Sequence, residues 1–370
     1  MFGSKDAPSI DAVKAGLAGV IDPVLGEPIG ALGFLGDVRI EDKRVRVAIE
    51  LPTLAWSGRE EIETLVNRRA ADLAPKHAVE IAWTSKVLQA RPEATGGQNL
   101  VPAAKNIILF ASGKGGVGKS TIATNVAAAL AESGASVGLL DADIYGPSIP
   151  TMFGTRQMPT IAQGGGKLIP IVQYGLKLMS IGFVVDPKEA MSWRGPMLNG
   201  ALIQFMRDVD WGDLDYLVLD MPPGTGDVQL TIAQNVKVSG AVLVSTPQDV
   251  ALADVVRAKS MFDRVGIPSL GVVENMSSFE CTSCHTVHQI FSHGGAAKLA
   301  ETLGIPLLAE VPIELGVREA GDRGKPEVLV QRTSVASKAM RALAQRIATD
   351  LAKAARTGGA KKKGGLKIVQ

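Results

Sequence analysis

The chain has 370 residues, of which 46% are hydrophobic, a composition that excludes a disordered polymer and fits two domains with ordinary cores. Its formal charge of +2 arises from the basic residues that follow Asp350, the last acid, so the preceding chain is net acidic, unlike a nucleic-acid-binding domain. Only two cysteines are present, and we find neither an apolar leader nor a run of ~20 apolar residues. We therefore expect a cytoplasmic protein with no disulfide framework, no nucleic-acid partner and no stable membrane insertion.

Residues 1–88 are predicted to form a small α+β domain. Alternating apolar and polar residues on both sides of a turn at 41–43 indicate a β-hairpin. The expected helices are 9–20 and 58–73, and the expected strands are 36–40, 44–51 and 79–85. Residues 89–103 are rich in proline, glycine and polar residues, as interdomain linkers are.

A phosphate-binding loop follows this linker. Residues 113–120 match G-x-x-x-x-G-K-[ST], in which backbone N–H groups cradle phosphates, the lysine reaches the outer phosphates and the hydroxyl meets Mg²⁺. An apolar run at 106–112 predicts a buried strand before the loop, and the alanine-rich segment 122–130 predicts a helix after it. We expect ATP and Mg²⁺ to bind at Gly113, Lys114, Gly115, Gly116, Val117, Gly118, Lys119, Ser120 and Thr121.

The same loop offers one alternative and one further signal. Its glycines also fit the dinucleotide fingerprint, with Asp141 roughly 20 residues further on. The lysine and hydroxyl residues that end the loop favour a triphosphate, because a pyrophosphate resting on helix amides needs no lysine there. Lys114 adds a cation at the start of the loop, and its long side chain can reach phosphates held by a neighbouring subunit. The sequence therefore suggests a nucleotide-gated homodimer.

Residues 104–355 are predicted to form a P-loop ATPase domain. Strand-like apolar runs alternate with helical segments, which implies βαβ units and a mostly parallel, doubly wound α/β sheet with helices on both faces. Besides the strand before the loop, we expect strands at 136–140, 176–181, 216–219, 241–245, 270–273 and 307–311, and an amphipathic helix at 334–354. Ligands of such sheets bind beyond the carboxyl ends of the strands. Residues 356–370 are expected to be a flexible basic tail.

Three aspartates follow predicted strands. We expect Asp143 to orient the water that attacks the γ-phosphate and Asp141 to lie in the outer shell of the metal. Asp220 closes an apolar strand, where a carboxylate near Mg²⁺ is expected, and Gly224 and Gly226 after it suit a nucleotide-dependent switch. The alternatives are that the first two cap the following turn, and that the third begins an ordinary strand-to-helix turn.

Two residues near other strand ends complete the expected nucleotide pocket. Asn275 follows the strand at 270–273, and its amide can read the adenine edge with a donor and an acceptor. Pro312 follows the strand at 307–311 and is expected to line the same base pocket. In isolation, each of these residues is a common turn residue.

Cys281 and Cys284 have a spacing that suits metal binding. Two such thiolates can hold Zn²⁺ or an iron–sulfur cluster, or form a redox pair. A site of four thiolates needs the same residues from a second subunit, which agrees with the dimer suggested by Lys114. Zinc bound within one chain is the competing interpretation, because three histidines lie close by, at His285, His288 and His293.

Together these motifs resemble the Mrp/ApbC family of iron–sulfur cluster carrier ATPases, which belongs to the MinD/ParA group of deviant Walker A proteins. The likeness covers about residues 104–350 and rests on the cysteine pair and on the segments 113–120, 141–148, 220–227 and 275–277. The N-terminal domain resembles the MIP18-type (DUF59) domain through the segments 22–26, 36–40 and 44–51.

The resemblance implies a role for each matching residue. Lys114 would act across the dimer, Lys119 would be the P-loop lysine and Ser120 the Mg²⁺ ligand. Asp143 would be the hydrolytic switch carboxylate, and Asn275 would contact adenine. The two cysteines, Cys281 and Cys284, would share a bridging [4Fe-4S] cluster with those of a second subunit.

The chain departs from the family pattern in two places. Family members usually have Cys-Pro-x-Cys-Gly, whereas this chain has Thr282 and His285 at the corresponding positions, which keeps the zinc interpretation open. Many free-standing MIP18-type domains carry a reactive cysteine near the position of Trp56, and this chain has none there. We therefore expect its N-terminal domain to dock partners rather than to bind metal through thiols.

These observations lead us to expect a slow, switch-type ATP hydrolase that carries a [4Fe-4S] cluster at its dimer interface. Its expected partners are apo iron–sulfur proteins and cluster assembly factors. The alternatives are a MinD/ParA-like positioning ATPase and a zinc-stabilised nucleotide-binding scaffold. A membrane-positioning ATPase is disfavoured because the segment 366–370 is too short to form an amphipathic anchor.

Overall fold

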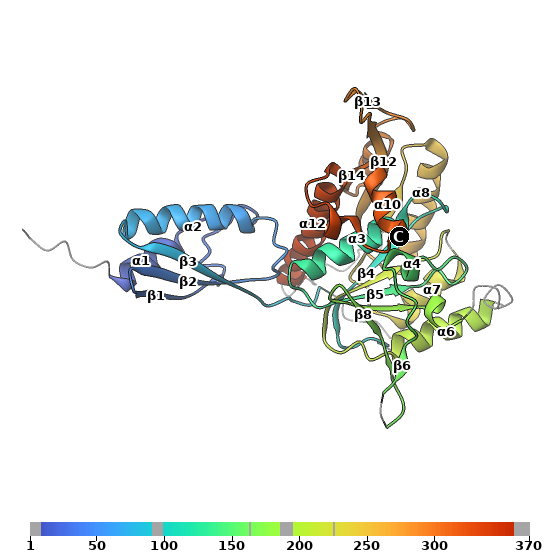
Figure 1. The fold of residues 1–370 in the computed structure, drawn as a ribbon, viewed down its shortest axis with the longest axis horizontal. Helices are drawn as coiled ribbons and strands as arrows, with labels where there is room; N and C mark the ends of the chain where they lie inside the picture. Colours follow the sequence, from blue (N-terminus) through green and yellow to red (C-terminus); the bar gives the residue numbers. More distant parts are fainter. Residues whose placement is uncertain (1–8, 91–98, 163, 186–194, 225, 359–370) are drawn as a thin grey trace, which may run out of the picture. The chain divides into compact units, whose positions relative to one another are not determined.

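The computed structural model describes residues 9–90, 99–162, 164–185, 195–224 and 226–358. The chain divides into two compact units, Met1–Leu88 and Gln89–Gln370 (Figure 1). Most of the predicted linker (91–98) and most of the predicted tail (359–370) lie outside the described residues. None of the described helices is both long and apolar enough to cross a lipid bilayer.

The first unit is a three-stranded sheet packed against two helices, in the sheet order β1-β2-β3. β1 and β2 are antiparallel, and β2 and β3 are parallel. The turn between β1 and β2 has positive φ at both Asp42 (50°) and Lys43 (59°), as a tight hairpin with right-handed strand twist requires. The predicted hairpin is therefore confirmed. The elements are α1 (Ile10–Ala18), β1 (Leu35–Glu41), β2 (Arg44–Leu51), α2 (Arg59–Leu73) and β3 (Ala78–Ser85).

The core of the first unit follows from side-chain periodicity. Alternate residues of β2 are buried, and α2 buries Ile62, Val66 and Ala70, which lie four residues apart on one helix face. Trp56 is also buried, and its Nε1 donates a hydrogen bond to Asp22 Oδ2 at 2.8 Å. Trp56, near whose position many free-standing MIP18-type domains carry a reactive cysteine, thus belongs to the core of this unit.

The second unit is built on a nine-stranded sheet with the order β13-β12-β11-β4-β10-β5-β9-β8, and β14 pairs with β12 outside this path. β13 and β8 pair antiparallel with their neighbours, and the other pairings are parallel. The predicted doubly wound α/β fold is thereby confirmed. The strands are β4 (Ala104–Ala111), β5 (Val137–Asp141), β8 (Ile171–Gln173), β9 (Leu176–Ser180), β10 (Leu214–Asp220), β11 (Gly240–Ser245), β12 (Ser269–Glu280), β13 (Val287–His288) and β14 (Leu307–Ile313).

Helices cover both faces of this sheet (Figure 1). Ile107 and Leu109 of β4 face a core shared with α6, α7, α8 and α9, while α3 and α12 lie against the other face. Helix α12 runs to Gly358, so the first residues of the predicted tail are helical. The main helices are α3 (Lys119–Glu132), α6 (Gly195–Asp208), α7 (Asp227–Asn235), α8 (Asp249–Arg264), α9 (Gly295–Leu303) and α12 (Val335–Gly358).

Several short elements complete the second unit. Two of them, β6 and β7, pair with each other in a separate antiparallel ribbon. Helices α10 and α11 connect β14 to α12. The bounds are α4 (Ile149–Met152), β6 (Thr160–Ile161), β7 (Leu168–Ile169), the 3₁₀-helix η1 (Ile181–Phe183), α10 (Leu315–Asp322) and α11 (Glu327–Val330).

β12 extends well beyond the predicted strand at 270–273. Its backbone bends at Met276, which has φ of 58°, and the pairing with β14 shifts register between Asn275 and Phe279. Beyond the bend, the strand pairs antiparallel with β13. Asn275 therefore lies inside a strand and not after one. Pro312 likewise lies inside β14, where a missing N–H is tolerated because, among the described strands, β14 pairs with β12 alone.

Candidate functional site

The predicted phosphate-binding loop connects β4 to α3. Gly116 and Gly118 both have φ of 82°, a backbone conformation that glycine adopts without strain. Gly113 is required for a different reason, because an added Cβ would lie 1.8 Å from Cβ of Asp254 in α8. The loop thus turns sharply and packs against a neighbouring helix before its amides reach the N-terminus of α3, where a helix binds anions.

The side chain of Asn275, in β12, forms a hydrogen bond with this loop. Its Nδ2 donates a hydrogen bond to the Val117 carbonyl oxygen at 2.9 Å. A Cβ on Gly118 would lie 2.1 Å from the same Nδ2 atom, so the contact leaves no room for a side chain there. One amide N–H of Asn275 is therefore used by the loop itself, and its contact with adenine stays a prediction.

Lys119 is buried and pairs with Asp220 at the end of β10. Its Nζ lies 2.5 Å from Asp220 Oδ1 and 3.2 Å from Ser120 Oγ. Asp220 is fully buried, and its other oxygen, Oδ2, has no hydrogen-bond partner among the described residues. A buried carboxylate with a free oxygen next to a hydroxyl is a donor set that suits Mg²⁺, so the residues present fit the predicted metal.

Asp141 is fully buried and stands opposite Asp220 in the pairing of β5 with β10. Its carboxylate accepts hydrogen bonds from three backbone N–H groups and one hydroxyl: Asp143 N at 3.2 Å, Ser148 N at 3.0 Å, Ile149 N at 3.2 Å and Ser180 Oγ at 3.0 Å. Burial, and then the Asp220 charge, raise its pKa to about 7. These contacts are those of a residue that caps the following loop, and its place in the outer shell of the metal stays a prediction.

Asp143 lies on that loop. Its Oδ1 accepts a hydrogen bond from Gly146 N at 3.3 Å. Burial raises the pKa of its carboxyl group, and the charge of Lys119 opposes this rise. The carboxylate is thus electrostatically coupled to the P-loop lysine, which is consistent with the expected position beside the γ-phosphate.

The predicted switch segment follows Asp220 and is tied to the P-loop strand by its backbone. Gly224, with φ of 93°, donates its N–H to the Ser112 carbonyl oxygen at 2.9 Å. Gln229 Nε2 donates to the carbonyl oxygens of Pro222 at 3.2 Å and Gly224 at 2.8 Å. Thr225 lies outside the described residues. Sequence reasoning missed Gln229, because a single glutamine in a helix carries no pattern.

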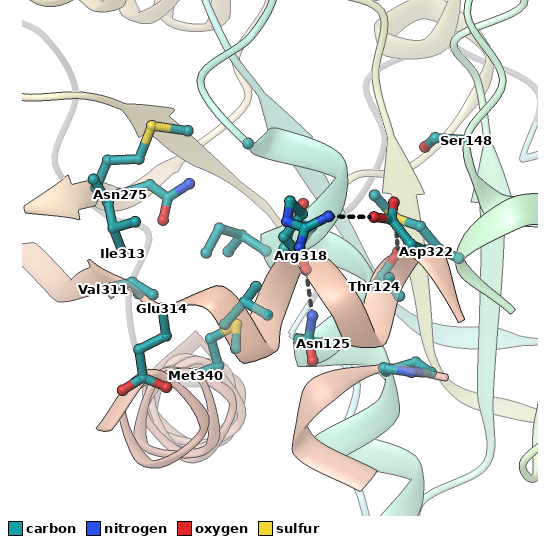
Figure 2. Close-up of a pocket in the computed structure, with 18 of the residues that line it drawn as sticks. Thr124, Asn125, Ser148, Asn275, Val311, Ile313, Glu314, Arg318, Asp322 and Met340 are labelled. Carbon is teal, nitrogen blue, oxygen red and sulfur yellow. Dashed lines mark hydrogen bonds and ion pairs between the residues drawn. The ribbon is translucent and has the colours of Figure 1, made fainter. Parts of the chain in front are cut away.

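A cavity of about 690 Å³ opens beside the loop (Figure 2). Its size suits a nucleoside or a comparable small molecule. The structure brings four of the predicted site residues to its wall, namely Gly118, Thr121, Asn275 and Pro312. Helix α10 adds Arg318 and Asp322, whose side chains pair at 3.1 Å and which the sequence analysis did not single out.

The two cysteines lie at the tip of a ribbon formed by the end of β12 and by β13. The turn is closed by hydrogen bonds from Cys281 N to the Thr286 oxygen at 3.0 Å and from His285 N to the Cys281 oxygen at 2.9 Å. Cys281 is half-buried and Cys284 is exposed. A side-chain hydrogen bond with Thr286 lowers the pKa of Cys284, which favours its thiolate.

Two of the histidines near the cysteines, His285 and His293, lie beside glutamates. His285 Nδ1 lies 2.7 Å from Glu280 Oε1, at the base of the turn. His293 lies beside Glu274 and Glu310. Within the described part of the chain, no group of three metal-ligating side chains includes a cysteine.

Comparisons with known proteins agree on the type of this chain. The family described as NUBPL iron-transfer P-loop NTPase matches residues 103–348, and the family described as iron-sulfur cluster assembly protein matches residues 10–83. The iron-sulfur cluster carrier protein of Synechocystis sp. is 44% identical over 349 residues, which cover 93% of this chain and 98% of the relative.

Solved structures are similar in fold to 60–65% of this chain. A nucleotide-binding protein from Archaeoglobus fulgidus, in complex with ADP, is 40% identical, with a TM-score of 0.54 over 60% of this chain and 87% of that protein. The cell division ATPase MinD of Pyrococcus furiosus is 22% identical, with a TM-score of 0.50 over 65% of this chain and 98% of that protein. At this identity the second likeness concerns the fold alone.

Proposed function

This chain belongs to the NUBPL iron-transfer P-loop NTPase family, and from this membership we propose that it is an ATP-hydrolysing carrier that binds a [4Fe-4S] cluster and delivers it to apo-proteins. One structural observation carries the proposal. β12 holds Asn275 against the P-loop and continues, after the bend at Met276, to Cys281. In this proposal β12 links the nucleotide site to the cluster site, which supports control of the cluster by nucleotide.

The nucleotide end of the proposal rests on the Lys119–Asp220 pair. In the proposed bound state the triphosphate lies on the amides of the loop, and Lys119 leaves Asp220 for the outer phosphates. Asp220 and Ser120 would then hold Mg²⁺, which neutralises phosphate charge. Asp143 would accept a hydrogen bond from the attacking water, and burial raises the pKa of its carboxyl group, which makes it a stronger base.

The loss of the Lys119 contact would also act on the switch segment, because Asp220 is its first residue. A ligand shifts a conformational equilibrium only by its differential affinity for the two states. The useful output of ATP in this proposal is a change of state and not a high rate, so we propose slow hydrolysis.

The cluster end of the proposal rests on the ribbon. One chain supplies two thiolates, Cys281 and Cys284, whereas a [4Fe-4S] cluster takes four. We propose that two copies of the chain meet at their ribbons and share one cluster as cargo. The exposure of Cys284 and its lowered pKa support this, since the sulfur is accessible to a second chain and inclined to ionise.

Lys114 belongs to the same proposal. The side chain is half-buried, and no acidic residue in the described part of the chain forms an ion pair with it. A lysine without an acidic partner next to a phosphate loop is a candidate to neutralise charge on a neighbouring subunit. The proposed partners are thus a second copy of the chain, apo iron–sulfur proteins and cluster assembly factors, and the proposed location is the cytoplasm.

The two alternatives are less well supported. A zinc scaffold needs histidines near the cysteines, but no group of three potential metal ligands among the described residues includes a cysteine, and His293 lies beside two glutamates. A positioning ATPase has support only from the fold likeness to MinD.

Anaerobic reconstitution with iron and sulfide tests the carrier proposal. We expect about four iron and four sulfide per two chains, together with dimerisation in sedimentation experiments. Cys281→Ser and Cys284→Ser should each abolish cluster binding, whereas Thr282→Ala, between them, should retain it. One zinc per chain with no cluster would overturn the proposal and support the scaffold.

A further inference from the structure

Three side chains from separate parts of the second unit converge beside the base of the cysteine ribbon. Glu274 comes from β12, Glu310 comes from β14, and His293 comes from the segment that returns from β13 to α9. One potential ligand atom from each of the three lies within 4.8 Å of those of the other two. His293 and Glu310 are exposed, whereas Glu274 is buried.

Glu274 is the unusual member of this group. It is fully buried, and its Oε2 accepts the Ala296 N–H, in the first turn of α9, at 2.8 Å. Its Oε1 is buried as well and has no hydrogen-bond partner among the described residues. A buried carboxylate oxygen without a partner costs free energy, so the site is incomplete as it stands.

The two glutamates also oppose each other in the sheet, because Glu274 and Glu310 are direct register partners in the β12–β14 pairing. Like charges at directly opposite positions destabilise a sheet unless a cation or a proton lies between them. His293 does not fill this role, since no hydrogen bond or ion pair joins it to either described carboxylate. The arrangement therefore brings two carboxyl groups and an imidazole close together without a hydrogen bond from the imidazole to either described carboxyl group.

We propose that Glu274, His293 and Glu310 bind one divalent transition-metal cation of the Zn²⁺ or Co²⁺ type. Two carboxylates and one imidazole form a donor set that suits such ions, with water completing the coordination. Ligand atoms lie about 2.0–2.2 Å from such a metal, so each atom needs to move by less than about 1 Å to close the site. The cation would satisfy Oε1 of Glu274 and neutralise the opposed carboxylates.

The position of this site gives it a structural consequence. Side chains alternate along a strand, so Glu274 and its neighbour Asn275 lie on opposite faces of β12, with Asn275 on the P-loop. His293 lies on the return arm of the ribbon. A bound cation would fasten this arm to both β12 and β14, and so would fix the base of the ribbon independently of any cargo at its tip.

Titration with Co²⁺ alone tests the proposal in the full-length Cys281→Ser/Cys284→Ser protein, which has no thiolate. We expect one Co²⁺ per chain, with ligand-field absorption and no thiolate-to-cobalt charge-transfer band. His293→Ala and Glu310→Gln change exposed side chains, and each should weaken the affinity roughly tenfold or more. A second readout is Zn²⁺-dependent stabilisation against heat, which both variants should lose.

Matched controls come from the same region. His288→Ala removes an exposed histidine of β13, and Glu301→Gln removes an exposed carboxylate of α9, and both should leave the Co²⁺ affinity unchanged. No saturable Co²⁺ binding in the cysteine-free protein would overturn the proposal. Equal affinity in the His293→Ala, Glu310→Gln and control variants would overturn it too. Because the cysteines are absent, neither outcome depends on the carrier function.

Discussion

At the scale of single residues, two opposed carboxylates dominate the electrostatics of the nucleotide site. Asp141 and Asp220 are register partners on β5 and β10, and both are fully buried. One cation, Lys119, is paired with Asp220, while Asp141 relies on hydrogen bonds from its own loop and from Ser180. The result is a pKa of about 7 for Asp141, raised first by burial and then by the charge of Asp220.

This shift predicts a pH dependence of stability. The pKa of Asp141 is about 7 in the folded state and about 4 in the unfolded chain. Its contribution to the free energy of unfolding is therefore fully present below about pH 4 and is lost as pH rises towards about 7. Between these limits the folded state binds one more proton than the unfolded chain, so the free energy of unfolding falls by up to about 1.4 kcal/mol per pH unit.

Asp141→Asn removes this ionisation while keeping an oxygen that accepts N–H groups. We expect the variant to have a flatter dependence of the free energy of unfolding on pH between about pH 4 and pH 7, measured by urea denaturation. Asp213→Asn, at an exposed position, is the control and should follow the wild-type curve. Identical curves for Asp141→Asn and the wild type would contradict this assignment.

At the scale of elements, β12 connects the P-loop to the ribbon. The Asn275 amide contacts the loop at Val117, and β12 ends at Glu280, directly before Cys281. We therefore predict that movement of the loop on nucleotide binding reaches the cysteines through one continuous backbone. The Asn275 hydrogen bond to the loop allows this coupling to be tested by one substitution.

We predict that ATP with Mg²⁺ changes the alkylation rate of Cys281 and Cys284 in the apo-protein, and that Asn275→Ala reduces this response. Removal of a buried hydrogen bond should also lower the free energy of unfolding by about 1–3 kcal/mol, because the Val117 oxygen loses its partner. Ser278→Ala, further along β12, is the control. The prediction fails if ATP changes the alkylation rate equally in Asn275→Ala and in the wild type, when both are saturated with nucleotide.

The sequence predicts most elements because their patterns are local. The apolar runs that end at Asp141 and Asp220 are strands in the structure, and the turn after Glu41 is a tight hairpin. The second half of β12 escaped prediction because polar Ser277 and Ser278 interrupt the apolar run, and the pairing with β13 that makes it a strand is a tertiary contact.

The sequence identified most residues of the candidate site but not the hydrogen bonds between them. Consecutive motif letters identify the loop, but nothing local shows that Asn275 bonds to Val117 or that Ser180 donates to Asp141. The Glu274–Glu310 pair depends on strand register between segments far apart in the chain, which no local pattern encodes. A charged residue within the apolar segment 270–274 was the one available signal.

At the scale of the whole molecule, the proposed dimer makes Lys114 a residue of its neighbour's site. We predict that Lys114→Ala and Lys119→Ala homodimers are both inactive in ATP hydrolysis, and that heterodimers of the two regain activity. In such a heterodimer one site combines an intact Lys119 with Lys114 of the other chain, so recovery should approach about half of the wild-type rate per dimer.

Differently tagged chains allow the heterodimer to be purified before its ATP turnover is measured. A heterodimer made from two tagged Lys114→Ala chains is the control, and it should remain inactive. Absence of recovery in the purified mixed dimer would show that Lys114 serves its own chain.

The bend at Met276 also bears on how such a protein can diversify. It separates the half of β12 that contacts the P-loop from a ribbon in which Phe279 and Glu280 pair with β13. Insertions or exchanges between Cys281 and His288 would alter the proposed cluster-binding part of the ribbon. They would leave unchanged the side-chain amide of Asn275, which contacts the P-loop. Grafting ribbons from other carriers onto this chain is therefore a practical route to chimeras that keep the P-loop domain and change the group bound at the ribbon.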